Sequence, residues 1–135
     1  MPAVHSTDEQ TRAVLDSADN GPIVIVNLVR YKEKAAYAPD SEEYGKGLSG
    51  RQAYLRYADE FMKLMADHGA RSLLEAETET YLIGEGDWDL VWTNYFPSRD
   101  TFRAVVTDPR YQAFVHHRLA GLESQDAIVT RPMVP

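Results

Sequence analysis

The sequence contains no cysteine among its 135 residues. A chain without thiols forms no disulfides, offers no cysteine nucleophile and holds neither Cys-ligated zinc nor an iron–sulfur cluster, so it suits a reducing compartment. Positive charge is also scarce, because 14 Lys and Arg face 21 Asp and Glu for a formal net charge of −7. Such a charge repels phosphate backbones and anionic lipids. We therefore expect neither a nucleic acid nor a membrane as a partner.

Long apolar runs are absent too, whereas a membrane span needs about 20 apolar residues. Residues 1–10 are polar and acidic, unlike a secretory signal, in which a basic segment precedes an apolar one. These features favour a cytoplasmic protein. The sequence also lacks the GxGxxG, Walker, GxSxG and HExxH patterns, so nucleotide-dependent, serine-hydrolase and zincin chemistries have no support. We accordingly predict no metal and no cofactor.

The composition that is present is typical of one globular domain. Hydrophobic residues make up 44% of the chain and charged residues 26%, and a chain of this length buries roughly two-thirds of its extended surface. Residues 1–135 are thus predicted to form a single domain, with an N-terminal helical extension over residues 1–20. Residues 31–48 are polar and include Pro39 and Gly45, and we expect them to form a long loop or a lid.

Hydrophobic periodicity predicts an alternating order of helices and strands. A capping box from Ser49 to Gln52 marks the start of a central helix that ends at Gly69. The predicted elements are a helix over 7–18, a strand over 23–29, the central helix, strands over 71–83 and 88–96, a helix after Pro97 that restarts at Asp108, and a strand over 127–131. This order is that of a ferredoxin-like α+β fold, a split β-α-β sandwich, behind an extra N-terminal helix.

The two faces of the predicted sheet should differ. Helices are expected to cover one face, and the other is too apolar for water, so two such faces are predicted to stack together into a homodimer. Strands 71–83 and 88–96 are expected to form a hairpin with a short turn at residues 84–86. In the 71–83 strand, the alternation should place Leu74 on one face and Glu75 and Glu77 on the solvent-exposed face. Charged residues of this kind are typical of an edge strand, where they discourage pairing with another chain.

One segment of the sequence is similar to a known family. It runs from Tyr95-Phe96-Pro97-Ser98 through Phe102 to Asp108-Pro109-Arg110-Tyr111 and on to Arg118-Leu119-Ala120. It resembles dimeric α/β-barrel proteins of the domain-of-unknown-function family numbered thirteen-thirty, and the similarity covers roughly residues 21–132. The resemblance implies the fold but no activity. The wider superfamily that it resembles includes cofactor-independent monooxygenases, muconolactone isomerase-like enzymes and heme-handling proteins, among which fold alone does not choose.

Two asparagines interrupt strands that are otherwise rich in apolar residues. Asn27 lies within the 23–29 strand, and Asn94 lies on its expected neighbour in line with Trp92. If both amides face one cavity, they could orient a carbonyl or a phenol, or stabilise an enolate. The alternative is structural, because buried amides usually bind backbone groups at a strand end or a bulge.

Aromatic residues and one arginine supply further candidates. Tyr54 and Trp92 belong to an aromatic set that makes up 10% of the chain and could line a pocket for a planar ligand. The same residues could instead fill a core or a dimer interface. Arg118 lies in an apolar helix, where its guanidinium needs a carboxylate partner, within the subunit or across the dimer, or else an anionic ligand.

His116 and His117 are the candidate catalytic residues, because imidazole titrates near neutral pH and can move a proton. Neighbouring positions on a helix are about 100° apart, so the two rings are not expected to aim at one metal ion. Surface or structural histidines are the alternative, since nothing in the sequence places a partner beside them.

These residues together predict a protein that binds a small aromatic or carbonyl metabolite in a partly apolar pocket under the 31–48 loop. It would either bind the metabolite only, or transform it as a cofactor-independent oxygenase or isomerase does. The predicted ligand-binding residues are Asn27, Tyr54, Trp92, Asn94 and Arg118. A non-catalytic dimeric module, in which these residues only pack, is the competing interpretation. Heme handling is a third, and it requires an exposed axial histidine that faces a wide apolar cleft.

Overall fold

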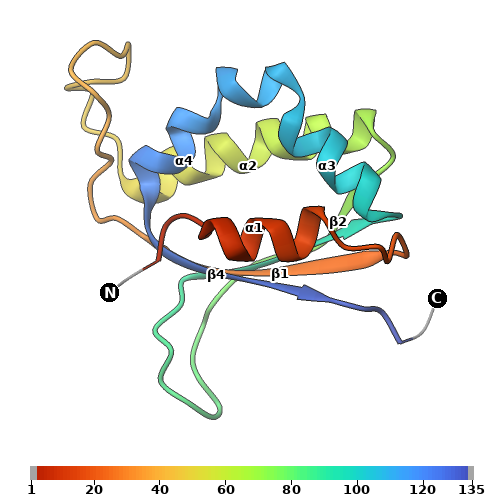
Figure 1. Ribbon diagram of the computed structural model, residues 1–135. Coiled ribbons are helices and arrows are strands. Elements are labelled where there is room, and N and C mark those ends of the chain that lie inside the picture. Colours follow the sequence, from red (N-terminus) through yellow and green to blue (C-terminus); the bar gives the residue numbers. More distant parts are fainter. Residues whose placement is uncertain (1–2, 134–135) are drawn as a thin grey trace.

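The computed structural model describes residues 3–133 and shows one antiparallel sheet under a layer of helices (Figure 1). Its elements are α1 (Asp8–Leu15), β1 (Ile23–Tyr31), α2 (Gly50–Asp67), β2 (Arg71–Glu77), β3 (Leu90–Phe96), α3 (Arg99–Thr107), the 3-10 helix η1 (Pro109–Ala113), α4 (Val115–Gly121) and β4 (Leu122–Thr130). The strand order is β2-β3-β1-β4, and all neighbours are antiparallel. The predicted ferredoxin-like α+β class is confirmed. Within the described residues, no helix is both long and apolar enough to cross a membrane.

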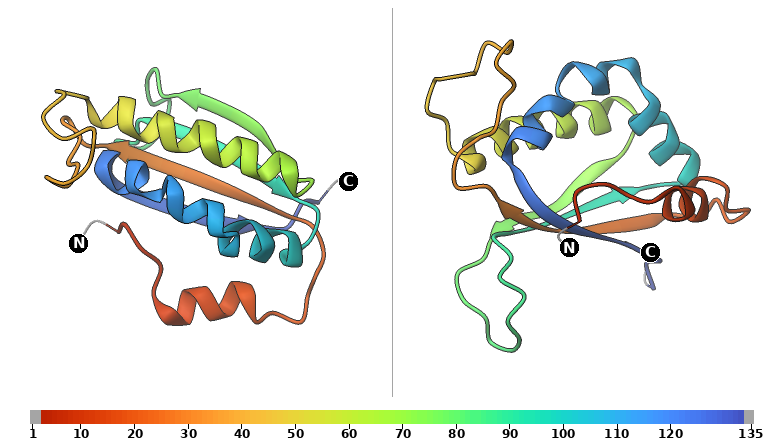
Figure 2. Two further views of the ribbon diagram at one scale, coloured as in Figure 1. Left: turned by 90° about the horizontal axis from the view of Figure 1, so that it is seen from above. Right: turned by 60° about the vertical axis from the view of Figure 1, so that its left-hand side comes forward.

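The helix layer covers a single face of the sheet. Helices α2, α3 and α4 lie above it in Figure 1, whereas α1 lies outside this layer, separated from α2 by α3 and α4 (Figure 2). The start of α2 is the predicted one, since Ser49 Oγ accepts from the Gln52 amide at 3.0 Å and Gln52 Oε1 accepts from the Ser49 amide at 2.8 Å. Both bonds satisfy amides that the first helical turn would otherwise leave unpaired.

The core lies between the sheet and α2. Alternate residues of β1 and β3 point into it, as a period of two dictates. Two glycines allow other backbone segments to approach the start of α2 closely: a Cβ on Gly50 would overlap the Lys32 carbonyl after β1, and a Cβ on Gly121 would overlap the Gly50 carbonyl. Helix α4 therefore rests directly on the start of α2, which fixes the side chains that α4 carries.

The predicted short hairpin turn is wrong. Strand β2 ends at Glu77 and β3 begins at Leu90, so residues 78–89 form a long loop that extends below the sheet in Figure 1. Arg30 binds the loop's backbone, because its Nε donates to the Asp87 carbonyl at 3.0 Å and its Nη2 donates to the Gly86 carbonyl at 2.9 Å. The carbonyls of Gly86 and Asp87 thus bind the Arg30 side chain and not the backbone of a neighbouring strand. Residues 78–83 alternate in polarity as a strand does, but β3 begins only at Leu90 and does not extend beside them.

Strand β2 is an edge strand with exposed glutamates on the face opposite Leu74, as predicted, but that face is the one that the helices share. Glu77 points to the helix layer, where both of its carboxylate oxygens accept from Arg51 of α2 at 2.7 Å. Leu74 lies on the opposite, open face and is 49% exposed. The cause is a register shift between Ser72 and Leu74, because one extra residue in a strand exchanges the faces of all residues after it.

Candidate functional site

A cavity of about 940 Å³ lies between the sheet and the helix layer, next to the β4 edge. The five residues predicted to bind a ligand all line it: Asn27, Tyr54, Trp92, Asn94 and Arg118. They reach it from β1, α2, β3 and α4. The alternation of the strands and the inward stripe of α2 therefore bring these side chains to one place, although up to 91 residues separate them in sequence.

The N-terminal segment closes the outer side of the cavity. Residues 3–6, 10–11 and 13–15 contribute to its lining, whereas residues 31–48 do not. The expectation that the 31–48 loop covers the pocket is thus wrong: this loop lies at the far end of the helix layer, where it packs against α4 (Figure 2). The N-terminal extension, which the sequence presented as an addition to the fold, is the roof of the cavity.

A chain of hydrogen bonds crosses the β4 side of the cavity. Asn27 Nδ2 donates to the Trp92 carbonyl at 3.0 Å, and Asn27 Oδ1 accepts from Gln125 Nε2 at 2.8 Å. Gln125 Oε1 in turn accepts from Arg118 Nη2 at 2.8 Å. Arg118 also donates to the carbonyl of Val4. Neither of these partners of Arg118 is a carboxylate, so within residues 3–133 no ion pair offsets its positive charge beside the cavity, and its bond to Val4 holds the N-terminal segment in place.

Asn94 differs from Asn27 in having an amide oxygen that is buried and unpaired. The residue is 2% exposed, and its Oδ1 is a buried atom without a hydrogen-bond partner within residues 3–133. A buried polar atom left unpaired costs about 1–3 kcal/mol. Native structures rarely retain such an atom without a reason. Its position in the lining of the cavity makes it the group most in need of a ligand.

Aromatic rings form the wall of the cavity under α2. The rings of Tyr54 and Tyr57 each meet Trp92 edge-on with centroids 6.3 Å apart, and Trp92 Nε1 donates to Ser72 Oγ at 3.0 Å. Burial raises the pKa of the Tyr54 and Tyr57 phenols, so both hydroxyls stay protonated and able to donate. These aromatics are core and cavity lining at once, and the two predicted roles do not exclude each other.

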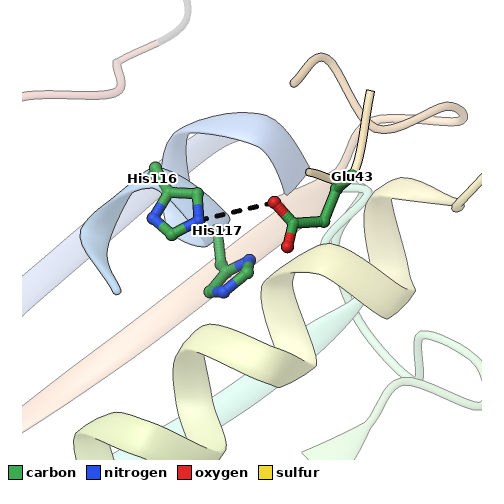
Figure 3. Close-up of side chains that lie close together, drawn as sticks. All are labelled: Glu43, His116 and His117. Atoms are coloured by element: carbon green, nitrogen blue, oxygen red, sulfur yellow. Dashed lines mark ion pairs between the residues drawn. The ribbon is translucent and has the colours of Figure 1, made fainter. Parts of the chain in front are cut away.

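The two predicted catalytic histidines lie elsewhere. His116 and His117 do not line the cavity but approach Glu43 of the 31–48 loop (Figure 3). Their ring centroids are 4.0 Å apart, so the expectation that adjacent helical positions send the two rings in different directions is wrong. The angle between Cα–Cβ bonds does not fix where a ring lies, because rotation about χ1 and χ2 moves it by several ångströms.

Burial and a phenol define the surroundings of His117. Its Nδ1 lies 2.7 Å from the hydroxyl of Tyr37, whose ring packs edge-on against both histidines. Burial, followed by the neighbouring imidazole of His116, lowers the pKa of His117. Burial and the charge of Glu43 raise the pKa of Tyr37, so this group is a neutral phenol. Both effects favour an uncharged hydrogen-bonded pair.

Among the cavity residues that sequence reasoning missed, Gln125 and His5 carry side chains able to act on a ligand. Gln125 links Asn27 to Arg118, but the predicted last strand began at residue 127, whereas β4 begins at Leu122. Extending the alternation of residues 127 and 129 backward would have placed Gln125 on the same face. His5 is the other, and it gives the cavity an imidazole. No local pattern marks it, because its position depends on how the N-terminal segment folds back.

Comparison with solved structures agrees with the architecture. A protein of unknown function from Rhodopseudomonas palustris is 28% identical with a TM-score of 0.85, and all of each chain is covered. Its methylated form is 31% identical, with a TM-score of 0.86 and coverage of 100% of this chain and 98% of that one. No match was found among curated proteins.

More distant structures share the fold alone. A DABB family protein with a ferredoxin-like fold from Mesorhizobium loti is 16% identical with a TM-score of 0.54, covering 84% of this chain and 99% of that one. A putative antibiotic biosynthesis monooxygenase from Bacteroides thetaiotaomicron is 11% identical with a TM-score of 0.53, covering 85% of this chain and 92% of that one.

The family model of the domain of unknown function DUF1330 matches residues 48–132. The chain therefore belongs to the DUF1330 family.

Proposed function

We propose that this protein binds a small aromatic or carbonyl-containing molecule in the cavity between the sheet and the N-terminal segment. The unpaired amide oxygen of Asn94 carries the proposal, because a ligand hydroxyl or N–H at this point would satisfy it. A carbonyl ligand would serve as well if the amide were turned by 180°, since amide O and N exchange places at little steric cost. A module built only for packing would have little reason to keep this atom unpaired.

The walls of the cavity favour a planar, partly polar ligand. The rings of Tyr54, Tyr57 and Trp92 offer apolar contact area, and the amides of Asn27 and Asn94 lie on neighbouring strands beneath them. The guanidinium of Arg118 gives the β4 side a positive charge that would attract a carboxylate or an enolate. This combination of apolar walls with a few convergent polar groups is typical of small-molecule sites.

Binding is better supported than catalysis by the predicted histidines. A general acid or base must come within hydrogen-bond reach of the reacting atoms, and His116 and His117 are absent from the cavity lining. Cofactor-independent oxygenase or isomerase chemistry in this cavity would need another proton carrier, for which His5 offers an imidazole. A non-catalytic module whose aromatics and amides only pack is the competing function.

Trp92 provides an internal reporter for a binding test. The chain has two tryptophans, and the other, Trp88, lies in the 78–89 loop with its ring near Arg30. In a Trp88→Phe background, Trp92 fluorescence would be titrated with small phenols, aromatic ketones and 4-hydroxybenzoate. Native mass spectrometry of the purified protein would first show whether it retains a molecule of a few hundred daltons.

Two variants and a control decide between ligand binding and packing. Asn94→Leu should weaken the Kd of the best compound at least tenfold, because it removes a buried polar contact worth more than about 1.4 kcal/mol. Asn27→Leu should also weaken it, because it releases Gln125, which in turn positions Arg118. Asn20→Leu removes an exposed amide that binds Asp100, and it should leave the Kd unchanged. Equal affinity in all three variants, with folding confirmed by circular dichroism, would favour the packing module.

A further inference from the structure

A second group of polar side chains gathers outside the cavity, between α4 and the 31–48 loop. Glu43, His116 and His117 each offer one ligand atom, and these three atoms all lie within 4.8 Å of one another. His116 Nε2 lies 3.7 Å from Glu43 Oε1, and Figure 3 shows the carboxylate directed toward the two rings. The cluster contains one carboxylate and two imidazoles, so it is not a patch of surface acids.

Two segments far apart in sequence hold this cluster in place. The close crossing of Gly121 over Gly50 fixes α4 and with it both histidines. The 31–48 loop is fixed by backbone bonds, since the Ala36 amide donates to the Ala120 carbonyl at 2.8 Å and the Ala35 amide donates to the Leu48 carbonyl at 2.9 Å. Glu43 is thereby presented to α4 from a loop whose two ends are anchored.

The donor set matches a borderline transition-metal ion. Imidazole nitrogen suits Zn²⁺, Ni²⁺, Cu²⁺ and Fe²⁺, whereas Ca²⁺ and Mg²⁺ prefer oxygen ligands alone. Three protein ligands with a fourth position left to water or another ligand is a common zinc arrangement. Ligand atoms at about 2.0–2.2 Å from one ion are about 3.3 Å apart in a tetrahedron, so small rotations of the Glu43 and His116 side chains would close the site.

We propose that Glu43, His116 and His117 bind one divalent transition-metal ion, with Zn²⁺ as the best-fitting ion. Tyr37 supports the site from behind, because an Nδ1–H of His117 donating to the Tyr37 oxygen, 2.7 Å away, leaves Nε2 with its lone pair for the metal. Such outer hydrogen bonds orient ligating imidazoles in metal sites. The side chain of His116 is 45% exposed, which leaves the ion a route from solvent.

The test uses the full chain, free of any affinity tag, after treatment with a chelator. Isothermal titration with ZnCl₂ should show one site per chain, and Co²⁺ should give the visible absorption of a low-coordinate ion. His116→Ala, which alters an exposed side chain, and Glu43→Gln should each weaken the Zn²⁺ Kd at least tenfold. His117→Ala should do the same, and its folding would be checked separately because His117 is half-buried.

Matched variants test whether the loss of any imidazole or carboxylate, at a position outside the cluster, also weakens Zn²⁺ binding. Glu42→Gln changes the exposed neighbour of Glu43, and His68→Gln changes a histidine that binds Asp108 instead; both should retain the wild-type affinity. The absence of a stoichiometric Zn²⁺ site in the unaltered chain would overturn the proposal. So would an unchanged Kd in both His116→Ala and Glu43→Gln. The cavity ligand plays no part in this assay, so its outcome is independent of the function proposed above.

Discussion

Two chemically identical side chains, Asn27 and Asn94, have opposite surroundings in the same cavity. Asn27 is held at both ends of its amide, by the Trp92 carbonyl and by Gln125, whereas Asn94 Oδ1 has no partner within residues 3–133. The sequence could show that both lie on inward positions of adjacent strands. It could not show which amide is satisfied, because the answer depends on Gln125, 31 residues beyond Asn94.

This difference predicts opposite effects on stability. Asn94→Leu should leave the free energy of unfolding of the ligand-free protein unchanged or raise it by about 1 kcal/mol, because it removes an unsatisfied buried polar atom. Asn27→Leu should lower it by about 1–3 kcal/mol, because Gln125 and the Trp92 carbonyl both lose a partner. Urea unfolding followed by far-UV circular dichroism measures both. A larger loss for Asn94→Leu than for Asn27→Leu would contradict the proposed role of Asn94.

At the scale of elements, α1 and the 31–48 loop have exchanged the roles expected of them. The loop is anchored against α4, and α1 contributes no buried residue although it borders the cavity. The N-terminal segment is held by hydrogen bonds to its backbone carbonyls, such as the Gln125 amide donating to the Ala3 carbonyl at 2.8 Å and Arg118 donating to the Val4 carbonyl. An element with so little buried surface is expected to open at low free-energy cost.

Removing the N-terminal segment should therefore expose the cavity without unfolding the domain. In the Trp88→Phe background, deletion of residues 1–16 should shift Trp92 emission to longer wavelength and increase its quenching by acrylamide. Replacing residues 40–46 by a short Gly/Ser linker is the matched control, because this stretch does not line the cavity. Equal quenching changes in the two variants would show that the N-terminal segment is not the roof.

The β2 strand shows why the local pattern alone was insufficient. Its alternation was recognised, yet the extra residue at Leu73 reverses the faces of Leu74 and Glu75. The same pattern continues past Glu77 to Ile83, where Arg30 from another strand binds the loop that follows. The capping box of α2 and the inward stripe of β1 were predictable because each depends on residues close in sequence. The bulge and the loop depend on partners that are not.

At the scale of the whole molecule, the face of the sheet opposite the helices carries mostly apolar side chains, with Thr93 and Asp126 among the polar exceptions. Outward positions of the four strands carry Leu74, Val26, Val91, Tyr95 and Ile128. Figure 1 shows that no helix of the described chain covers this face. Leu82 and Ile83, at 96% and 90% exposed, lie in the 78–89 loop that extends on the same side. A second copy stacked face to face would bury this surface, so the predicted homodimer is retained as a proposal.

A charge placed on this face should separate the subunits. Val26→Lys should yield a monomer by native mass spectrometry and sedimentation velocity, because each subunit would then bury a lysine in the proposed interface. Leu119→Lys changes an exposed leucine on α4, on the helix side of the molecule, and should leave the association state unchanged. A monomeric unaltered chain at micromolar concentration would remove the sheet-to-sheet arrangement.

Helix α4 spans only seven residues, yet His117 and its neighbour Arg118 serve different ends of the molecule. His117 contacts Tyr37 beside the proposed metal cluster, and Arg118 holds Val4 and Gln125 beside the cavity. An ion that shifted the backbone of His117 even slightly would also shift that of Arg118, and with it the hydrogen bonds of Arg118 to Val4 and Gln125. By thermodynamic reciprocity, any factor by which the metal changes the ligand Kd must equal the factor by which the ligand changes the metal Kd. The proposed metal site and the cavity would then be coupled through the peptide bond that joins His117 to Arg118.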